Sequence, residues 1–134
     1  MKFKQFAALP YRMRDDAVEI LLITTRKKGR WSVPKGWPIK RKSPQQTAAT
    51  EAYEEAGVHG AVGDKRIGQF RKRRLKKRHL VMCDVQIFPL AVTRQQKKWP
   101  ESERSRVWVA PRKAAKLVKK AGLRRAIKSY QAWK

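Results

Sequence analysis

Three glutamates occur within five positions of a chain that is otherwise strongly basic. The chain has 134 residues and a formal net charge of +25, with 35 lysines and arginines against only 10 acidic residues. Glu51, Glu54 and Glu55 lie together in the middle of this sequence. Carboxylates this close repel one another unless a cation neutralises them, and Mg²⁺ or Mn²⁺ prefers such oxygen ligands. The cluster therefore predicts a divalent-metal site.

The residues around the glutamates predict a helix over 44–56. Ser43 is suited to cap its start, and Gln46, three positions later, completes a capping box. Pro44 fits the first helical position, where its missing N–H costs nothing. Gly57 is placed to end the helix in a left-handed conformation. The signals at both ends agree, so the boundaries of this helix follow from the local sequence.

The helical period places the glutamates on one side of this helix, with Thr47 among them. A solvent-exposed face is the ordinary explanation for such a pattern, but exposed faces usually mix charges of both signs. The helix carries no lysine or arginine, although the chain is rich in both. This absence favours a metal-binding face. The opposite side is expected to pack on a sheet through Ala49, Ala52, Tyr53 and Ala56.

A metal held by such carboxylates predicts a particular chemistry. Mg²⁺ usually keeps several waters and binds substrate phosphates directly, so the site is expected to act on a diphosphate with a water attacking in line. A carboxylate beside that water can accept its proton. The preceding loop, Pro34-Lys35-Gly36, can bring a backbone carbonyl to the metal, because glycine permits close approach of the chain.

The whole sequence predicts one α/β domain spanning residues 1–134. Val18 to Thr24 is apolar on both faces, which is typical of a strand covered on both sides. The run Arg71 to Arg78 has seven bases around Leu75 and is expected to form an exposed hairpin or flexible loop. Helices layered on a mixed sheet are favoured. Further expectations are strands at 2–9, 31–33, 65–70, 79–92 (broken or bent near Pro89) and 107–109, a polar turn at 12–16, and helices at 111–120 and 123–133.

The charge of the chain predicts a polyanionic partner. A field of this sign attracts phosphorylated small molecules, nucleic acid or anionic membrane, although general solubility is an alternative explanation. No apolar run approaches the ~20 residues of a membrane span, and no membrane partner is expected. The single cysteine, Cys83, excludes an intrachain disulfide. Cytoplasmic localisation is the default expectation.

At the glutamates the sequence resembles the signature of the Nudix hydrolase family. That signature joins an early glycine to Arg-Glu, an aliphatic residue, a Glu-Glu pair, a glycine and a final aliphatic residue. Two positions depart from it, because Lys42 stands where the first glutamate is expected and Thr50 where the arginine is expected. In the family, the glutamate and the arginine at these two positions support the helix electrostatically. The matching positions are Gly36, Glu51, Ala52, Glu54, Glu55, Gly57 and Val58.

The resemblance extends over nearly the whole chain. The run AVEILLITTRKKGRWSVPKGW is similar to the segment before the signature in diphosphoinositol polyphosphate phosphohydrolases and their bacterial relatives. Residues 106–109 resemble their late strand. This resemblance implies a Nudix-type α/β/α sandwich with a mixed β-sheet, and it implies that the chain is an enzyme that cleaves phosphoanhydride bonds with Mg²⁺ or Mn²⁺ as cofactor.

The resemblance also implies roles for individual residues. The Lys35 carbonyl, Glu51 and Glu55 are the implied metal ligands, and Glu54 is the implied base or an additional ligand. Glu51 and Glu54 are therefore the candidate catalytic residues. Some family members take the base from a later loop, where this chain has Glu101 and Glu103.

The implied substrate is a compound with several phosphates, such as a dinucleoside polyphosphate or an inositol pyrophosphate. Two alternatives remain open: removal of pyrophosphate from RNA 5′ ends, and a nucleic-acid-binding module that has lost catalysis. Trp37 and Trp99 lie in loops where either could stack on a base or sugar. Bases flank the site in related enzymes, and the corresponding residues here are the candidate substrate-binding residues. Each of them could instead be an ordinary solvated surface residue: Lys4, Arg26, Lys27, Arg30 and Arg74.

Overall fold

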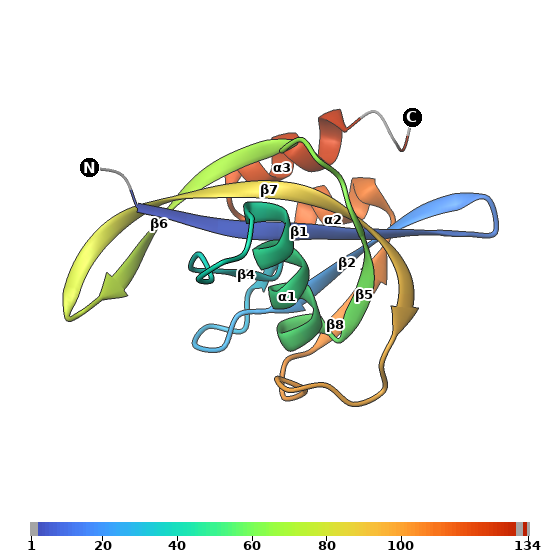
Figure 1. Cartoon of the computed structure of the whole chain (residues 1–134). Coiled ribbons are helices and arrows are strands. Elements are labelled where there is room, and N and C mark those ends of the chain that lie inside the picture. Colours follow the sequence, from blue (N-terminus) through green and yellow to red (C-terminus); the bar gives the residue numbers. More distant parts are fainter. Residues whose placement is uncertain (1–2, 131–132, 134) are drawn as a thin grey trace.

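Two long central strands, β1 (Phe3–Arg14) and β7 (His79–Gln95), organise the computed structural model, which describes residues 3–130 and 133 (Figure 1). They run parallel, with Phe3 opposite Cys83 at one end. The remaining elements are β2 (Ala17–Thr24), β3 (Trp31–Ser32), β4 (Lys35–Gly36), α1 (Pro44–Ala56), β5 (Val58–Val62), β6 (Gly68–Lys76), β8 (Arg106–Val109), α2 (Pro111–Leu117) and α3 (Ala121–Ser129).

These strands form one mixed sheet. Its main path is β3-β2-β1-β7-β5, while β4 pairs with β1, β6 with β7 and β8 with β2. The pairs formed by β2, β4, β5, β6 and β8 with their neighbours are antiparallel, in contrast to the parallel β1–β7 pair. The predicted mixed sheet is therefore confirmed.

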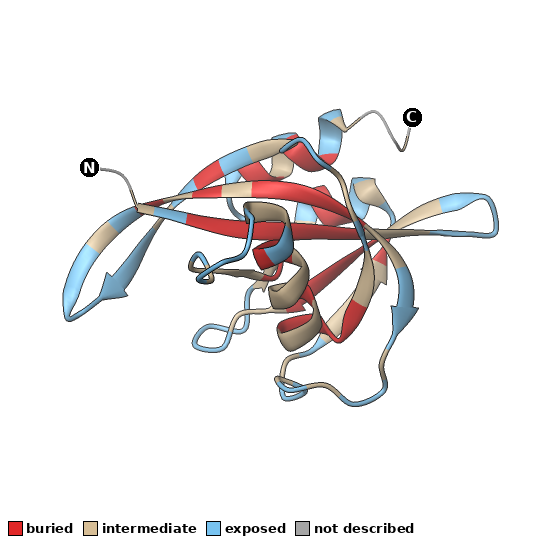
Figure 2. Cartoon of the chain, viewed as in Figure 1, coloured by how far each residue is buried: buried red, intermediate tan, exposed pale blue. Residues whose placement is uncertain are grey.

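Alternating apolar side chains give the sheet a buried core on each face. On β2, Ile20 and Leu22 belong to the core under α2 and α3, while Leu21 and Ile23 belong to the core under α1. This alternation follows from the two-residue period of a strand. Buried segments accordingly run through the middle of the central strands (Figure 2). The result is the α/β/α sandwich that the family resemblance implies.

The predicted start and end of α1 are confirmed by its capping contacts. The backbone N–H of Gln46 donates to Ser43 Oγ at 3.1 Å, and the Ser43 N–H donates to Gln46 Oε1 at 2.9 Å. Gly57 follows the helix in the left-handed region, with φ of 68°. The packing face is wrong in part, because Ala48 is buried with Ala52 and Ala56, whereas Ala49 and Tyr53 are only partly buried.

The basic run forms a hairpin, which confirms the first of the two predicted alternatives and not the flexible loop. β6 pairs with β7 from Gly68–Ile87 to Lys76–His79, and the chain turns at Lys77 and Arg78, which both have positive φ. The predicted strand at 65–70 was therefore too early and too short. Bases on both faces of an exposed ribbon hide the alternation that would normally reveal a strand.

Other boundaries also differ from the predictions. β1 continues to Arg14, and its turn lies at Asp15 and Asp16. β7 passes through Pro89 unbroken; its carbonyl accepts from Gly63 N–H at 2.9 Å. Helices α2 and α3 end at Leu117 and Ser129, earlier than predicted. Residue 2 of the first predicted strand and residues 131–132 of the last predicted helix lie outside the described residues. Within the described chain, no helix is long and apolar enough to cross a membrane.

Candidate active site

The short strand β4 places the backbone of the predicted loop beside β1 at the sheet and next to α1. Gly36 pairs with Phe6 and Lys35 with Ala7, and the Ala8 N–H donates to the Pro34 carbonyl at 3.0 Å. β1 therefore fixes the position of this backbone, which also lies next to α1.

Two of the three glutamates contact β4 directly. The Lys35 N–H donates to Glu55 Oε1 at 3.3 Å, and the Glu55 side chain is buried, with only 7% of the residue exposed. A Cβ atom on Gly36 would lie 2.5 Å from the Glu51 carboxyl carbon. Such a separation is far below van der Waals contact, so glycine is required here for Glu51 to reach its position.

The Glu51 and Glu55 carboxyls lie close together in a site where burial reduces their solvation. They are close enough for each to affect the protonation of the other. Burial raises the pKa of Glu51 to about 8, and the neighbouring Glu55 carboxyl adds to that effect. Burial also raises the pKa of Glu55, although Arg104 and Lys35 partly oppose the change. A site that concentrates acidic groups in this way is suited to a cation.

The donors present fit a hard divalent metal that is completed by water and substrate. Among residues 3–130 and 133, no three His, Cys, Asp or Glu side chains form a ready-made metal site. Glu51 and Glu55 nevertheless meet at the Lys35–Gly36 backbone, which carries the Lys35 carbonyl. Mg²⁺ is commonly bound through one or two carboxylates, waters and substrate phosphates. Two carboxylates with an adjacent backbone carbonyl match that requirement.

An arginine missed by the sequence reasoning ties a later loop to the carboxyl pair. Arg104 lies 3.8 Å from Glu55 and 2.8 Å from Glu101, and it also donates to the Thr24 carbonyl at 3.0 Å. It therefore brings Glu101 beside the site, where the Glu101 charge contributes to the raised pKa of Glu51. Nothing in the local sequence distinguishes Arg104 from the many other bases.

The two alternative bases in that loop have different surroundings. Glu101 is held by Arg104 and by Arg26, at 2.8 Å and 3.2 Å. Glu103 is largely exposed and pairs with Arg26 at 3.1 Å. Glu101 acts on the carboxyl pair, since its charge helps to raise the pKa of both Glu51 and Glu55. Glu54 lies one position before Glu55 and is partly exposed, which leaves its carboxylate accessible to water.

The two positions that depart from the signature contact each other. Lys42 Nζ donates to Thr50 Oγ1 at 2.8 Å, and Thr50 Oγ1 donates in turn to the Gln46 carbonyl at 2.9 Å. Nearby, Thr47 Oγ1 accepts from the Ile39 N–H at 3.4 Å. The loop therefore remains attached to α1, because a hydrogen bond takes the place of the expected acid–base pair.

A cluster of cations lies on the opposite side of β4. Opposite residues in an antiparallel pair point to the same face, so the Lys35 side chain shares the face of Ala7, under α2 and α3. There it meets Lys72 of β6. Burial and the charge of Lys72 lower the pKa of Lys35 to about 7. Burial and the charge of Arg74 lower the pKa of Lys72.

Gln5 adds a neutral polar group to this cationic face. It lies on β1 two positions before Ala7, opposite Val85 of β7. Gln5 is buried, and within the described residues its side-chain oxygen has no hydrogen-bond partner. Buried polar groups are normally paired, so this oxygen is an exception among the buried groups of the face. Lys72 and Gln5 were not predicted, because their positions become meaningful only once β6 and β7 are aligned.

The predicted substrate-binding bases occupy several different positions. Arg74 belongs to the cationic face, since its charge acts on Lys35 and Lys72. Arg26 is engaged with the Glu101 loop. Lys27 and Arg30 are exposed in the turn between β2 and β3. Lys4 is exposed on β1 opposite Asp84. Their contact with substrate remains a prediction.

The two loop tryptophans also differ. The Trp99 indole N–H donates to the Glu55 carbonyl at 3.0 Å, and the Arg106 guanidinium lies 3.8 Å from its ring centroid. Trp99 therefore packs against the end of α1, and the expectation that it stacks on substrate is not supported. Trp37 lies near the cationic face, with Lys76 Nζ 4.8 Å from its ring.

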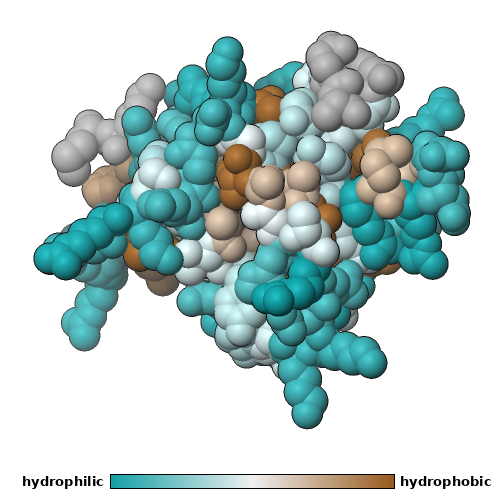
Figure 3. Space-filling view, turned by 45° about the vertical axis from the view of Figure 1, so that its right-hand side comes forward, coloured by the Kyte–Doolittle hydropathy of each residue, from teal (hydrophilic) through white to brown (hydrophobic). Residues whose placement is uncertain are grey.

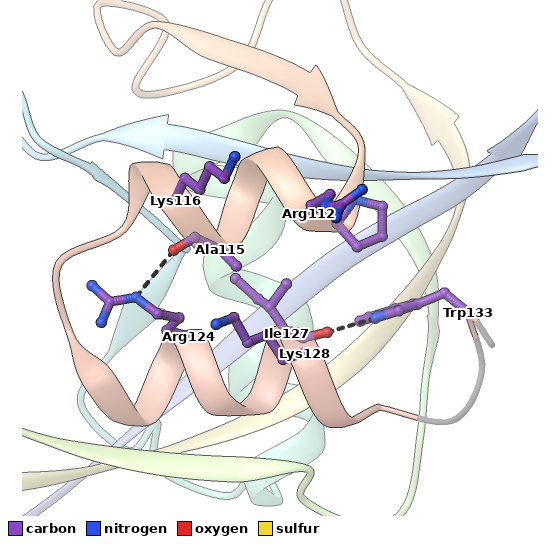
Figure 4. Close-up of a pocket in the computed structure, with 8 residues that line it drawn as sticks. Arg112, Ala115, Lys116, Arg124, Ile127, Lys128 and Trp133 are labelled. Atoms are coloured by element: carbon purple, nitrogen blue, oxygen red, sulfur yellow. Dashed lines mark hydrogen bonds between the residues drawn. The ribbon is translucent and has the colours of Figure 1, made fainter.

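A separate cavity of about 690 Å³ lies between α2 and α3 (Figure 4). The Arg124 guanidinium is committed there to backbone carbonyls, including that of Ala115 at 3.2 Å. Among the described residues that line this cavity none carries a carboxylate, the group that the predicted chemistry needs. We therefore place the candidate active site at β4 and α1. The cavity is lined by Pro111, Arg112, Ala115, Lys116, Arg124, Ile127, Lys128 and Trp133.

Sequence comparison establishes the family. The model of the NUDIX domain matches residues 2–130, and the chain therefore belongs to the Nudix family. Nudix hydrolase 21, chloroplastic, from Arabidopsis thaliana is 37% identical over 128 residues, which cover 91% of this chain and 63% of that protein. Diphosphoinositol polyphosphate phosphohydrolase 3-alpha from Mus musculus is 30% identical over 118 residues, covering 86% and 68% of the two chains.

Structural comparison supports the same fold. The crystal structure of an Ap4A hydrolase from C. elegans superposes with a TM-score of 0.69 at 18% identity, covering 98% of each chain. The chain spans 63% and 62% of the length of two Nudix hydrolases of Arabidopsis that it matches.

Proposed function

We propose that this protein is a metal-dependent pyrophosphohydrolase that cleaves a diphosphate linkage in a phosphate-rich substrate. The observation that carries the proposal is the arrangement of charge around β4. The Glu51–Glu55 carboxyls lie on one side, and the Lys35 and Lys72 ammonium groups lie on the other. A metal–polyphosphate complex supplies the opposite charge to each side.

Each residue near β4 has a role in this proposal. Glu51, Glu55 and the Lys35 carbonyl would hold Mg²⁺ or Mn²⁺, which neutralises charge on the phosphoryl oxygens when bound. Glu54, which is partly exposed, accepts a proton from the attacking water. Glu101 is the alternative base, because Arg104 holds it beside the carboxyl pair. Lys35 and Lys72 hold phosphates that lie farther from the scissile bond.

The substrate that we favour is a dinucleoside polyphosphate or an inositol pyrophosphate. The names of an Ap4A hydrolase and of diphosphoinositol polyphosphate phosphohydrolases among the similar proteins support this class. The cationic face offers Lys72 and Arg74 to several phosphates at once. Trp37 lies where it can contact a sugar or base.

An RNA 5′ end is the second candidate substrate. The exposed basic strand β6 leads away from the cationic face, which suits the phosphate backbone of an RNA. A nucleic-acid-binding module without catalysis would use the same surface, but it would need neither the buried Glu55 nor the close approach of Glu51 to Gly36. Cytoplasmic localisation remains a proposal, and one relative bears the name chloroplastic.

A substrate panel tests the proposal. The purified chain is incubated with dinucleoside polyphosphates, inositol pyrophosphates, nucleoside triphosphates and triphosphorylated RNA, with Mg²⁺, Mn²⁺ or EDTA. Metal-dependent release of product from one of the first two classes is expected. Preferential cleavage of RNA would move the assignment to the second candidate, and the absence of turnover on every substrate would overturn catalysis altogether.

A further inference from the structure

The β6–β7 hairpin projects beyond the rest of the sheet. The last described pairing of β7 with β1 is at Phe3 and Cys83, whereas β6 and β7 stay paired to Lys76 and His79. The two strands therefore continue as an isolated ribbon, which extends to one side in Figure 1. Figure 2 shows that most of this ribbon is exposed.

One face of the ribbon carries exposed aliphatic side chains. Leu75 and Leu80 are directly opposite each other, and Met82 lies opposite Arg73 on the same face. Their exposed fractions are 61%, 66% and 47%. Among the described residues only Met13 is a comparably exposed large hydrophobic residue, at 61%. Elsewhere the surface in view is largely hydrophilic, with small separate apolar patches (Figure 3).

The same ribbon is strongly cationic. Seven of the eight residues from Arg71 to Arg78 are lysine or arginine. Arg71 is opposite Asp84, which lies at the base of the ribbon. No acidic residue occurs between 72 and 83. The tip therefore combines an apolar face with a dense positive charge and with no internal acid to balance it.

We propose that this ribbon docks on an anionic lipid surface. Leu75, Leu80 and Met82 enter the boundary between headgroups and acyl chains, while the surrounding bases contact anionic headgroups. Such surface binding combines apolar burial with electrostatic attraction. It needs no membrane-spanning segment, so it revises the expectation that no membrane partner exists.

Charge and side-chain chemistry distinguish this partner from others. A second copy of the chain would bring two cationic ribbons together, which like-charge repulsion opposes. Single-stranded nucleic acid is usually gripped by aromatic side chains that stack on bases, and residues 71–82 include no Phe, Tyr or Trp. Aliphatic side chains are stabilised more by transfer into the hydrocarbon region of a bilayer than by contact with bases or phosphates.

Alternation along the strand places the leucines on the side of the sheet that carries α1, away from the cationic face. Lys72 and Arg74 point to the face that meets Lys35, whereas Leu75 and Arg73 point to the other face. Membrane docking through the leucines therefore leaves the proposed phosphate-binding residues available. The proposal does not depend on the proposed hydrolase activity, and the two can fail separately.

Vesicle flotation tests the docking. The full chain is mixed with vesicles of phosphatidylcholine and phosphatidylglycerol, or of phosphatidylcholine alone, and the bound fraction is measured. We expect binding only to the anionic vesicles. The double variant Leu75→Thr/Leu80→Thr keeps the charge and the tendency to form strands, and its affinity should fall about tenfold. The control Met13→Thr removes an equally exposed residue at a different turn and should bind as the wild type does.

Three outcomes would overturn the proposal. The first is equal vesicle binding by the wild type and the double leucine variant, because binding would then depend on charge alone. The second is an equal loss of binding to a short single-stranded RNA, which would assign the ribbon to nucleic acid. The third is a matching loss in the Met13→Thr control. Circular dichroism of all three proteins verifies that the fold is retained.

Discussion

The two sides of β4 carry opposite charges, and on both sides burial disfavours the charged form of the side chains. On the α1 side, burial raises the pKa of Glu51 to about 8 beside Glu55. On the α2–α3 side, burial lowers the pKa of Lys35 to about 7 beside Lys72. Each side gathers like charges where solvation is reduced. The difference between them teaches that the site is suited to a ligand that is cationic at one end and anionic at the other.

On the carboxyl side of β4, the substitution Glu55→Gln is expected to cause the largest loss of activity. The substitution keeps the shape of a buried side chain but removes a negative charge beside the Lys35 N–H. Loss of several kcal/mol of charge stabilisation corresponds to a fall in kcat of about a thousandfold. Steady-state kinetics on the best substrate measures the effect. Asp64→Asn, which changes an exposed acid elsewhere, should retain wild-type turnover.

Gly36→Ala tests the position of the second carboxyl without changing any charge. The new Cβ would overlap the Glu51 carboxyl, 2.5 Å away, and would displace it. A displacement of this kind is expected to lower kcat/KM by about ten- to a hundredfold. Gly29→Asn is the matched control, since Gly29 has φ of 60° and open space around it, and asparagine tolerates that conformation. Unchanged kinetics in Gly36→Ala would contradict the site geometry.

The cationic side is tested by two neighbouring bases on one strand. Lys72→Ala removes an ammonium group whose charge acts on Lys35, and we expect KM to rise about tenfold with a smaller change in kcat. Arg73→Ala removes the same charge from the opposite face of β6. It should leave KM near the wild-type value. Equal effects of the two variants would show that only the general field matters.

The stability of the Glu51→Gln variant without metal, compared with that of the wild type at different pH values, tests the burial of the Glu51 carboxyl. The folded pKa of Glu51 lies above its usual value near 4.5, so its ionised form destabilises the folded state. This penalty grows as pH rises from about 4.5 to about 8 and is complete above that range. With EDTA at pH 9, the variant should be more stable by about 1–2 kcal/mol, after solvent screening of a partly exposed group is considered.

Urea denaturation at pH 5 and pH 9 measures this difference. The gap between wild type and variant should be small at pH 5 and larger at pH 9. Saturating Mn²⁺ should reverse the order at pH 9, because metal binding stabilises the wild type by linkage. A variant that is less stable than the wild type at both pH values, with or without metal, would contradict the assignment.

The smallest effect is expected at Lys42, outside both charge clusters. Lys42→Ala removes the hydrogen bond to Thr50 at 2.8 Å, but this contact is exposed. The free energy of unfolding should fall by about 0.5 kcal/mol or less, and kcat should change less than twofold. A large loss of activity would show that this bond positions the loop for catalysis.

Local sequence carried the prediction of α1 and its glutamates. Ser43, Pro44 and Gln46 fix the start of the helix and Gly57 fixes its end, because capping depends on residues a few positions apart. The helical period then places Glu51 and Glu55 on one side. The C-terminal ends of α2 and α3 were predicted less well, since the residues that follow them, Val118 and Tyr130, are not the glycine or asparagine that usually marks a helix end.

Tertiary structure decided how the residues of the site differ from one another. Glu54 and Glu55 are adjacent and chemically identical, but only Glu55 is buried against β4. Lys72 is one base among many until β6 aligns with β7 and faces Lys35. The sequence by itself determined an acidic helix in a basic chain, because that information is local. Burial and long-range pairing determined which charges meet, because those contacts join residues far apart in the chain.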